Sequence, residues 1–410
     1  MSHRNPESSK AAASGQDRLL PVSSWVLYDF ANTIFYAIVV TRYLPLQLTE
    51  LTGKHFVINF GFYPAMLASA LLAPWVGRWA GARGLSIRTV GGFTIACCLF
   101  TACLGWAESA WSLLLFFALA QVFYQLALVP YNNLLPSVAS TKHMGLVSGL
   151  GVGIGYAGVI VSLLLADRII QASGSSSDYS PAYFVAAGLF LLFTLPMLFI
   201  VRERPTVARD KGVGIRDVLN LMKDRVCRRF IIGNFLCADA LNALLVLIAV
   251  YLKMSLGFSD ADLLSLFIVL NVSAMISGVL LGFLTDRLSA RTVMPLAAAA
   301  LSLSVTITHF SNDTNTAYWS IVLLGGPGVA GLWVAGRKWV VQLAPENDVG
   351  TLFGFYGLSN KISLINITLF TLLADWTGGY TASVCVLVVS LLIGIWVLLT
   401  VPAVRPGPAV

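Results

Sequence analysis

Long apolar runs recur from one end of this chain to the other, and they restrict its fold more than any other feature. Trp111 to Leu128 and Ala382 to Val401 are two of them. A helix needs about 20 mostly apolar residues to cross roughly 30 Å of hydrocarbon. Only 11% of the residues are charged, whereas soluble domains carry roughly 25%. The chain is therefore predicted to lie within a membrane.

Helices are expected rather than the strands of a barrel. A helix satisfies its own backbone polar groups in lipid, whereas barrel strands alternate apolar and polar residues, and the apolar runs show no such alternation. We predict an all-α membrane protein with twelve transmembrane helices in two six-helix bundles. The predicted spans are 24–49, 57–80, 88–106, 110–135, 145–166, 181–201, 229–253, 263–285, 291–309, 316–340, 349–373 and 377–402.

The polar segments between the spans predict the domain organisation and the orientation. Residues 1–22 are expected to be a disordered tail, 23–201 the first bundle, 202–228 a basic linker, 229–402 the second bundle and 403–410 a short tail. With both termini in the cytoplasm, 21 of the 26 Lys and Arg residues fall on the cytoplasmic side, as the positive-inside rule requires. The net charge of +7 is thus explained by topology rather than by nucleic-acid binding.

The two halves share short motifs at a nearly constant offset. Asp29-Phe-Ala-Asn32 recurs as Asp239-Ala-Leu-Asn242, 210 residues later, and Leu-Leu-Pro136 recurs as Leu-Ala-Pro345, 209 residues later. Gly145-x-x-x-Gly149 recurs as Gly350-x-x-x-Gly354 at an offset of 205. Several matches in the same order indicate a duplicated six-helix unit. Parallel repeats of this kind are typical of major facilitator transporters, which bind substrate near the midplane between the halves.

The segment after the eighth span, Gly282-x-x-x-Asp286-Arg287, resembles the loop motif of these transporters. The resemblance implies a gating loop in which Asp286 caps a helix end and pairs with an arginine across the interface, and Arg337 is included in this group. In the first half, Gly81 stands where the acidic residue is expected, so a latch there is in doubt. The alternative is that both loops are ordinary short basic turns.

A longer set of motifs resembles one family within this superfamily. The segment from Trp25 to Phe35 is similar to the opening signature of the vacuole-effluxer-like family, which includes autophagy-associated vacuolar amino-acid exporters. Further similar segments in the same order are Tyr131–Pro136, Gly155–Gly158, Asp239–Asn242, Arg337 and Leu352–Lys361. The resemblance implies transport of amino acids or similar small solutes. Thr351 departs from it, since a glutamate is expected there, and this puts proton coupling through that position in doubt.

Charged side chains inside the spans are the main candidates for a substrate or coupling site. An ionisable group within a span costs about 2.5–3.5 kcal/mol on insertion scales and normally faces a cavity or a partner. Asp29 lies in span 1, with Asn32 one turn later on the same helix face. It is expected to bind substrate or a proton, and the alternative is a helix-end carboxylate that pairs with a basic loop residue.

Asp239 is expected to lie closer to mid-membrane than Asp29, with Asn242 on the same face of span 7. Burial disfavours the charged form of a carboxyl group, so Asp239 is the preferred candidate for the protonated coupling group. Lys361 in span 11 supplies the alternative, a fixed Asp–Lys pair between helices of the same half. A pair that breaks on protonation would combine both roles.

The remaining candidates are polar side chains within spans. Arg42 is able to bind a carboxylate or phosphate, but an arginine near a helix end more often extends toward the interface, and we prefer that interpretation. The others either hydrogen-bond between helices or line an aqueous cavity. They are Tyr28, Gln125, Asn132, Asn133, Tyr356 and Asn360.

Catalytic and cofactor-binding motifs are absent from the sequence. It contains no phosphate-binding loop, nucleophile elbow or zinc-protease motif. The six cysteines lie in apolar spans or the central loop without metal-ligand spacing to histidine. No enzymatic activity, cofactor or metal is therefore expected.

A monomeric secondary transporter, moving a small solute and coupled to protons, is the leading functional hypothesis. It is expected in the cell membrane, specifically the inner membrane of a bacterium. One alternative is a receptor or scaffold on the same fold that does not transport. Another is a uniporter of a sugar or an organic acid. A membrane enzyme is disfavoured because no catalytic set is present.

Overall fold

The computed structural model describes residues 19–53, 55–172, 178–203, 220–311, 313–345, 348–361 and 365–404. Residues 1–18, most of the predicted linker (204–219) and 405–410 lie outside them. No strand occurs in the described ranges. The helices of the first half are α2 (Leu19–Phe35), η1 (Tyr36–Tyr43), α3 (Leu44–Thr52), η2 (His55–Ile58), α4 (Asn59–Ala82), α5 (Ser86–Leu104), α6 (Ala110–Asn133), α7 (Leu135–Val138), α8 (Met144–Ala172) and α9 (Ser180–Ile200).

The second half continues the same pattern. Its helices are α11 (Arg225–Leu256), α12 (Asp260–Leu288), α13 (Ala290–Phe310), α14 (Thr314–Ser320), η3 (Ile321–Gly325), α15 (Gly326–Leu343), α16 (Val349–Lys361), α17 (Ile365–Thr377) and α18 (Thr381–Leu399).

Twelve helical stretches in the described residues are long and apolar enough to cross a membrane, in agreement with the twelve predicted spans. Two of them begin four or more residues earlier than predicted. The first starts at Leu19, inside the segment predicted as tail, and the seventh starts at Arg225 rather than at residue 229. Asp224 explains the second difference, because its carboxylate accepts hydrogen bonds from the backbone N–H groups of Val226 and Cys227, both at 2.9 Å. An N-cap of this kind fixes where a helix begins.

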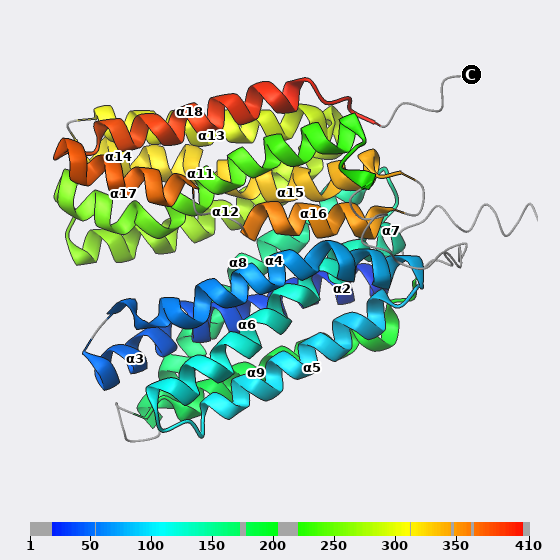
Figure 1. Cartoon of the computed structure of the whole chain (residues 1–410), viewed down its shortest axis with the longest axis horizontal. Coiled ribbons are helices and arrows are strands. Elements are labelled where there is room, and N and C mark those ends of the chain that lie inside the picture. Colours follow the sequence, from blue (N-terminus) through cyan, green and yellow to red (C-terminus); the bar gives the residue numbers. More distant parts are fainter. Residues whose placement is uncertain are drawn as a thin grey trace, which may run out of the picture.

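The helices form two bundles that lie side by side along their lengths (Figure 1). Each bundle has its own buried apolar core, one built from residues between Trp25 and Val201 and the other from residues between Leu221 and Val401. A small third cluster joins them, in which Val152 of α8 packs with Ala274, Ala330 and Val334 of the second bundle. The predicted fold class is confirmed.

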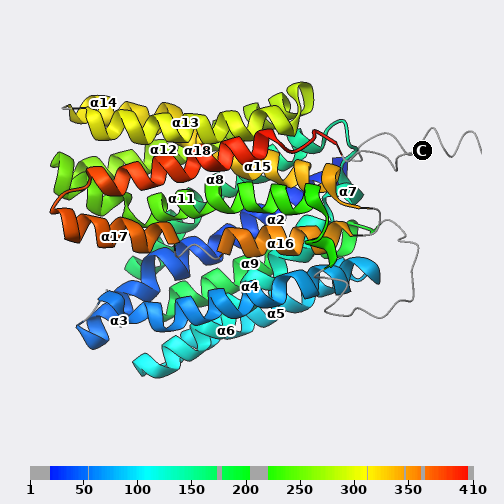
Figure 2. The same cartoon turned by 45° about the horizontal axis from the view of Figure 1, so that its top comes forward.

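One end of the molecule holds the start of α2, the helix α7 and the end of α18, and we call it the terminal end (Figures 1 and 2). The opposite end, which holds α3, α14 and the end of α17, is called the far end. The polar contacts between the bundles described below lie mainly toward the terminal end.

Three of the membrane-crossing stretches depart from regular α-helix. The first contains the π-helical segment η1, and the tenth contains the π-helical segment η3. The eleventh consists of α16 and α17, which end and begin on either side of residues 362–364. Single-turn π segments within helices often lie at functional sites, and η3 contributes to a feature described below. The helix α17, which follows the break in the eleventh stretch, contributes to another.

Candidate functional site

A buried ion pair joins the two bundles toward the terminal end. Arg337 of α15 donates from Nη1 to Oδ2 of Asp29 in α2 at 2.7 Å and from Nη2 to Oδ1 at 3.4 Å. The side chains are only 12% and 6% exposed. Removing one partner of a buried pair typically costs 3–5 kcal/mol, because the other charge is left uncompensated. A variant that keeps only one member of the pair would therefore leave a buried charge uncompensated.

Aromatic rings and a small residue shape the pocket around this pair. The Arg337 guanidinium lies 5.7 Å from the ring centre of Trp25 and 5.8 Å from that of Tyr131. These rings stack at 4.6 Å, and Asn32 donates to Asp29 Oδ1 at 3.1 Å. A Cβ at Gly151 would lie 2.4 Å from Asp29 Oδ2, so α8 approaches the carboxylate closely. The aromatic faces and the amide thus hold both charged groups in fixed positions.

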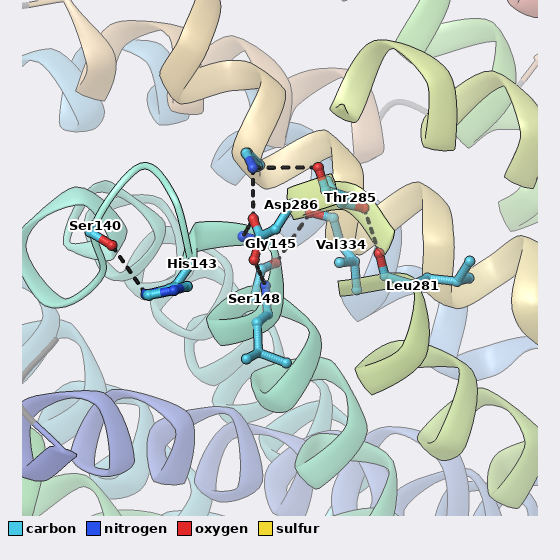
Figure 3. A network of polar contacts seen from close by, with 10 residues as sticks. Ser140, His143, Gly145, Ser148, Leu281, Thr285, Asp286 and Val334 are labelled. Atoms are coloured by element: carbon cyan, nitrogen blue, oxygen red, sulfur yellow. Dashed lines mark hydrogen bonds and ion pairs between the residues drawn. The ribbon is translucent and has the colours of Figure 1, made fainter. Parts of the chain in front are cut away.

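A second polar contact between the bundles centres on Asp286 at the end of α12 (Figure 3). Its two carboxylate oxygens accept from the backbone N–H groups of Gly145 and Leu146, each at 2.7 Å. These groups belong to the first turn of α8, where unpaired N–H groups and the helix dipole attract an anion. Lys338 donates to the same carboxylate at 2.6 Å. Asp286 therefore joins α12 and α15 of one bundle to α8 of the other.

This arrangement corrects part of the predicted gating loop. Asp286 does cap a helix across the interface, but its cationic partner is Lys338 of its own bundle and not an arginine across the interface. Arg337 is occupied by Asp29, and the Arg287 guanidinium lies 4.4 Å from the ring centre of Phe283. Gly282 is close to the backbone of α8, since a Cβ there would lie 2.6 Å from Gly145 O.

A third contact occupies the corresponding place in the first half, where the sequence left a latch in doubt. Arg78 near the end of α4 donates to Asp348 at 2.7 Å. Asp348 directly precedes α16, and its carbonyl accepts from Leu352 N at 3.0 Å. A basic residue on one bundle thus reaches an acidic residue at the helix start of the other. The polarity is opposite to that of the contact at Asp286.

Charge reversal tests this third contact. We expect Arg78→Asp to lower the apparent midpoint of thermal unfolding, because it replaces attraction by repulsion, and Asp348→Arg to do the same. The double variant should recover at least half of the loss, since contacting pairs show interaction energies of roughly 0.5–3 kcal/mol. Lys142→Asp, a charge reversal at an exposed position of the same end, serves as the control. Strictly additive losses in the double variant would contradict the pairing.

Glycines let the backbones of the two bundles meet between these polar contacts. A Cβ at Gly77 of α4 would lie 2.0 Å from Gly350 O in α16. On the other side of the interface between the bundles, a Cβ at Gly149 of α8 would lie 2.3 Å from Gly278 O in α12. Small residues permit this close approach between membrane helices. The two helix pairs, α4 with α16 and α8 with α12, form what we call the glycine seam.

The hydrogen bonds that the structure describes for Asp239 lie inside the second bundle. It is 1% exposed, and its Oδ2 accepts from the backbone N–H of Asn366 at 3.0 Å and from Asn366 Nδ2 at 2.8 Å. Asn366 stands at the beginning of α17 and also donates to Ser390 in α18. A carboxylate at a helix N-terminus is stabilised there. The geometry gives Asp239 a part in holding α11, α17 and α18 together.

The predicted partner of Asp239, Lys361, makes a different contact. Its ammonium group donates to the backbone carbonyl of Gln125 in α6 at 2.8 Å, across the two bundles. Asn242 donates to the carbonyl of Asn360 at 2.9 Å, and Asn360 accepts from Asn234 at 2.9 Å. Polar groups thus line the contact between α11 and α16, with Lys361 linking this region to the first bundle.

The other predicted residues fall into three settings. Tyr28 is buried beside Tyr131 and hydrogen-bonds Thr94 at 2.9 Å, and Tyr356 is buried against Phe230. The side-chain oxygen of Asn132 is buried with no hydrogen-bond partner among the described residues. Arg42 forms a half-exposed pair with Asp167 of α8 at 3.2 Å, within the first bundle near the far end.

Asn133 lies in a small polar pocket at the terminal end. Its side chain donates to Ser86 at 2.9 Å, and Gly81, Glu203 and Gly350 also line the pocket. Glu203 accepts from the backbone N–H of Ile87 at 2.7 Å. Burial raises the pKa of the Glu203 carboxyl group above its usual value, although this hydrogen bond opposes the shift. The pocket borders the glycine seam.

Sequence reasoning missed Arg78, Asp348 and Lys338 as contact residues. Each stands within three residues of a position that the loop motif or the repeats had drawn attention to, namely Gly81, Gly350 and Arg337. Asn366 was also missed as the partner of Asp239. Among the described residues, no group of three or more His, Cys, Asp or Glu side chains is placed to hold a metal ion.

Two six-helix bundles that meet along one seam, with buried ionic contacts between them, define a class of two-bundle membrane transporters. A sequence model of the Major Facilitator Superfamily matches residues 22–366 and 231–409. The chain belongs to this superfamily, and its members are transporters.

Individual relatives agree with this membership. The uncharacterized MFS-type transporter YxiO of Bacillus subtilis is 26% identical over 405 residues, covering 93% of this chain and 94% of the relative. Autophagy-related protein 22 of Eremothecium gossypii is 22% identical over 449 residues, covering 87% and 85%. The second match confirms the resemblance to the vacuole-effluxer-like family, at low identity.

Solved structures share the fold. The human organic anion transporter MFSD10 (TETRAN) gives a TM-score of 0.77 at 13% identity, covering 92% of this chain and 99% of that protein. A bacterial homologue of the iron transporter ferroportin, in an outward-facing state, gives a TM-score of 0.71 at 18% identity, covering 92% and 97%.

Proposed function

We propose that this chain is a proton-coupled secondary transporter of a small solute, and that the Asp29–Arg337 pair is its coupling gate. The observation that carries the proposal is a single one: a buried ion pair whose two members belong to different bundles. If the bundles move as rigid bodies to expose a central site alternately to each side, this pair must break whenever the terminal end opens.

Protonation provides a way to break it. A neutral carboxyl group at Asp29 would lose most of its attraction to Arg337, while Asn32 would remain as a hydrogen-bonding neighbour. Since the pair is desolvated, its strength depends strongly on the charge of both members. Binding of a proton would therefore favour opening, and release of the proton would favour closing.

The arrangement favours Asp29 as the coupling group over Asp239, the residue that its predicted depth in the membrane favours. Depth raises the cost of a charge, but a gating group also needs a partner that moves relative to it. Asp239 accepts a hydrogen bond from Asn366, which lies in the same bundle, so movement of the bundles leaves that contact intact. We assign Asp239 a positioning role for α17 and leave coupling to Asp29.

Orientation follows from the distribution of basic residues. The positive-inside rule would place the terminal end, and both termini, in the cytoplasm of the cell. The seam contacts at Asp286 and Asp348 would then close the cytoplasmic side.

For the substrate, the relationship to an autophagy-related protein and the resemblance of its motifs favour an amino acid or a similar small solute. Two other functions would fit the same fold, a uniporter of a sugar or an organic acid and a receptor or scaffold that does not transport. Neither requires a gate that responds to protons, and the buried Asp29–Arg337 pair is the observation that favours coupling.

Flux measurement in proteoliposomes separates these functions. A thermal-shift screen over amino acids, organic acids and sugars first selects ligands, and their uptake is then measured with and without an imposed pH gradient. We expect up to about tenfold accumulation per unit of pH difference, if one proton moves with each solute, and loss of accumulation on adding a protonophore. Equilibration without accumulation would indicate a uniporter, and absence of flux for every ligand would contradict transport.

A further inference from the structure

The second bundle contains a cavity of about 170 Å³ between its helices, in the half nearer the far end. All six membrane-crossing stretches of this bundle contribute to it, and Tyr156 of α8 reaches it from the first bundle. Leu247, Phe267, Leu301, Val305, Val329 and Leu387 form much of the wall. None of the 21 lining residues carries a charge, so the cavity is suited to an uncharged apolar group.

Aromatic rings pack together in the interior of the first bundle. The ring centre of Tyr124 lies 4.9 Å from that of Phe35 and 6.4 Å from that of Phe190, and Tyr28 lies 5.9 Å from Phe190. Aromatic rings thus occupy this region of the first bundle, whereas the second bundle holds an opening between its helices.

Two polar groups on the cavity wall are available to a ligand. Asn271 donates from Nδ2 to Phe267 O at 2.7 Å, while its side-chain oxygen has no hydrogen-bond partner in the described part of the chain. The same holds for the Tyr156 hydroxyl group. In contrast, Ser304 donates to the carbonyl of Ser320 at 3.0 Å beside the π-helical segment η3. The wall is thus apolar, with one free acceptor and one free hydroxyl.

We propose that this cavity binds the uncharged apolar group of the transported solute, a ring or a branched chain of about the size of benzene, with Asn271 and Tyr156 bonding an adjacent polar group. An apolar cavity of about 150 Å³ stays dry and binds benzene, so the size fits. That the ligand is the transported solute rests on the proposed function. Binding itself does not depend on that function.

The probe for the site is 4-fluorophenol, which combines a ring with one hydroxyl group and is neutral at pH 7. Its ¹⁹F NMR signal is followed with the full-length protein in lipid nanodiscs, and empty nanodiscs give the contribution of lipid partitioning. We expect a saturable bound signal from the protein. The matched anion 4-fluorobenzoate should give none, because the cavity offers no charged partner.

Variants locate the signal. Val305→Phe and Val329→Phe should each remove it by filling the cavity, whereas Val250→Phe, at an exposed position of α11, should leave it unchanged. Tyr156→Phe should weaken the binding of 4-fluorophenol by roughly 2–10-fold, as expected for one hydrogen bond, and leave the binding of fluorobenzene unaffected. This variant decides the question if both filling variants fail to fold.

The outcomes separate the site from the transport function. If 4-fluorophenol still binds to a folded filling variant, the proposal is overturned. It is also overturned if Tyr156→Phe leaves the affinities for 4-fluorophenol and fluorobenzene changed by the same factor. If wild type binds the probe but no solute is transported, the site stands and the proposed function fails. If a solute is transported but neither binds at the cavity nor displaces 4-fluorophenol, the function stands and the inference fails.

Discussion

Gly77→Ala is expected to prevent the terminal end from closing and to reduce transport at least tenfold. The added methyl group would lie 2.0 Å from the carbonyl oxygen and 2.9 Å from the carbonyl carbon of Gly350. Both atoms belong to backbone, so a side-chain rotation relieves neither contact. The helices α4 and α16 must separate, and the Arg78–Asp348 contact near them is then lost as well.

Gly92→Ala provides the matched control, because a Cβ at that position of α5 meets nothing within 4 Å. Alanine is favoured over glycine in a helix by up to about 1 kcal/mol, so this variant should keep wild-type uptake and stability. Gly350→Ala, with its Cβ 2.1 Å from Gly77 O, should reproduce the defect from the opposite helix. Normal uptake by a folded Gly77→Ala protein would show that close approach at the seam is not needed for the cycle.

Asp29→Asn is expected to abolish accumulation of solute driven by a pH gradient while leaving exchange of solute across the membrane largely intact. The amide keeps the shape of the carboxylate but binds no proton in the working pH range. Exchange requires no net proton movement, so it survives if the bundles still rock. The measurement compares uphill uptake with counterflow in the same proteoliposomes.

Variants of two further aspartates test whether this result is specific to Asp29. Asp167→Asn removes a carboxylate that also pairs with an arginine, but in a half-exposed contact within one bundle, and it should leave both activities close to wild type. Asp239→Asn should lower uphill uptake and counterflow together, since its contacts position α17. If Asp239→Asn alone abolished uphill uptake, the coupling group would be Asp239 and the gate would lie elsewhere.

Much of the fold is predictable from sequence because each crossing of the membrane demands a long apolar segment. The predicted spans agree with the helices to within five residues at every boundary except the end of α8, which lies six residues beyond the predicted one. The cap at Asp224 accounts for the four-residue shift at the start of α11. The capping role of Asp286 was also predictable, since the motif Gly282-x-x-x-Asp286-Arg287 carries it.

The partners of the charged residues were not predictable in the same way. Arg337 and Lys338 are neighbours in sequence, yet successive residues on a helix point about 100° apart, so one meets Asp29 and the other meets Asp286. Which of them faces the other bundle depends on the rotation of α15, and composition does not fix that rotation. Asp29 and Arg337 are also 308 residues apart, and only the packing of the two bundles brings them together.

The most direct test of the gate is a distance measurement between the bundles at the terminal end. Spin labels at Thr141→Cys before α8 and Leu288→Cys at the end of α12 occupy exposed positions on opposite bundles, with the exposed Cys385 replaced by serine. We expect one short distance for the protein without solute at neutral pH, and a second, longer population when solute is added at low pH. Asp29→Asn should show the longer population at both pH values. A single short distance under every condition, in protein that transports, would contradict the opening of this end and with it the role of the Asp29–Arg337 pair.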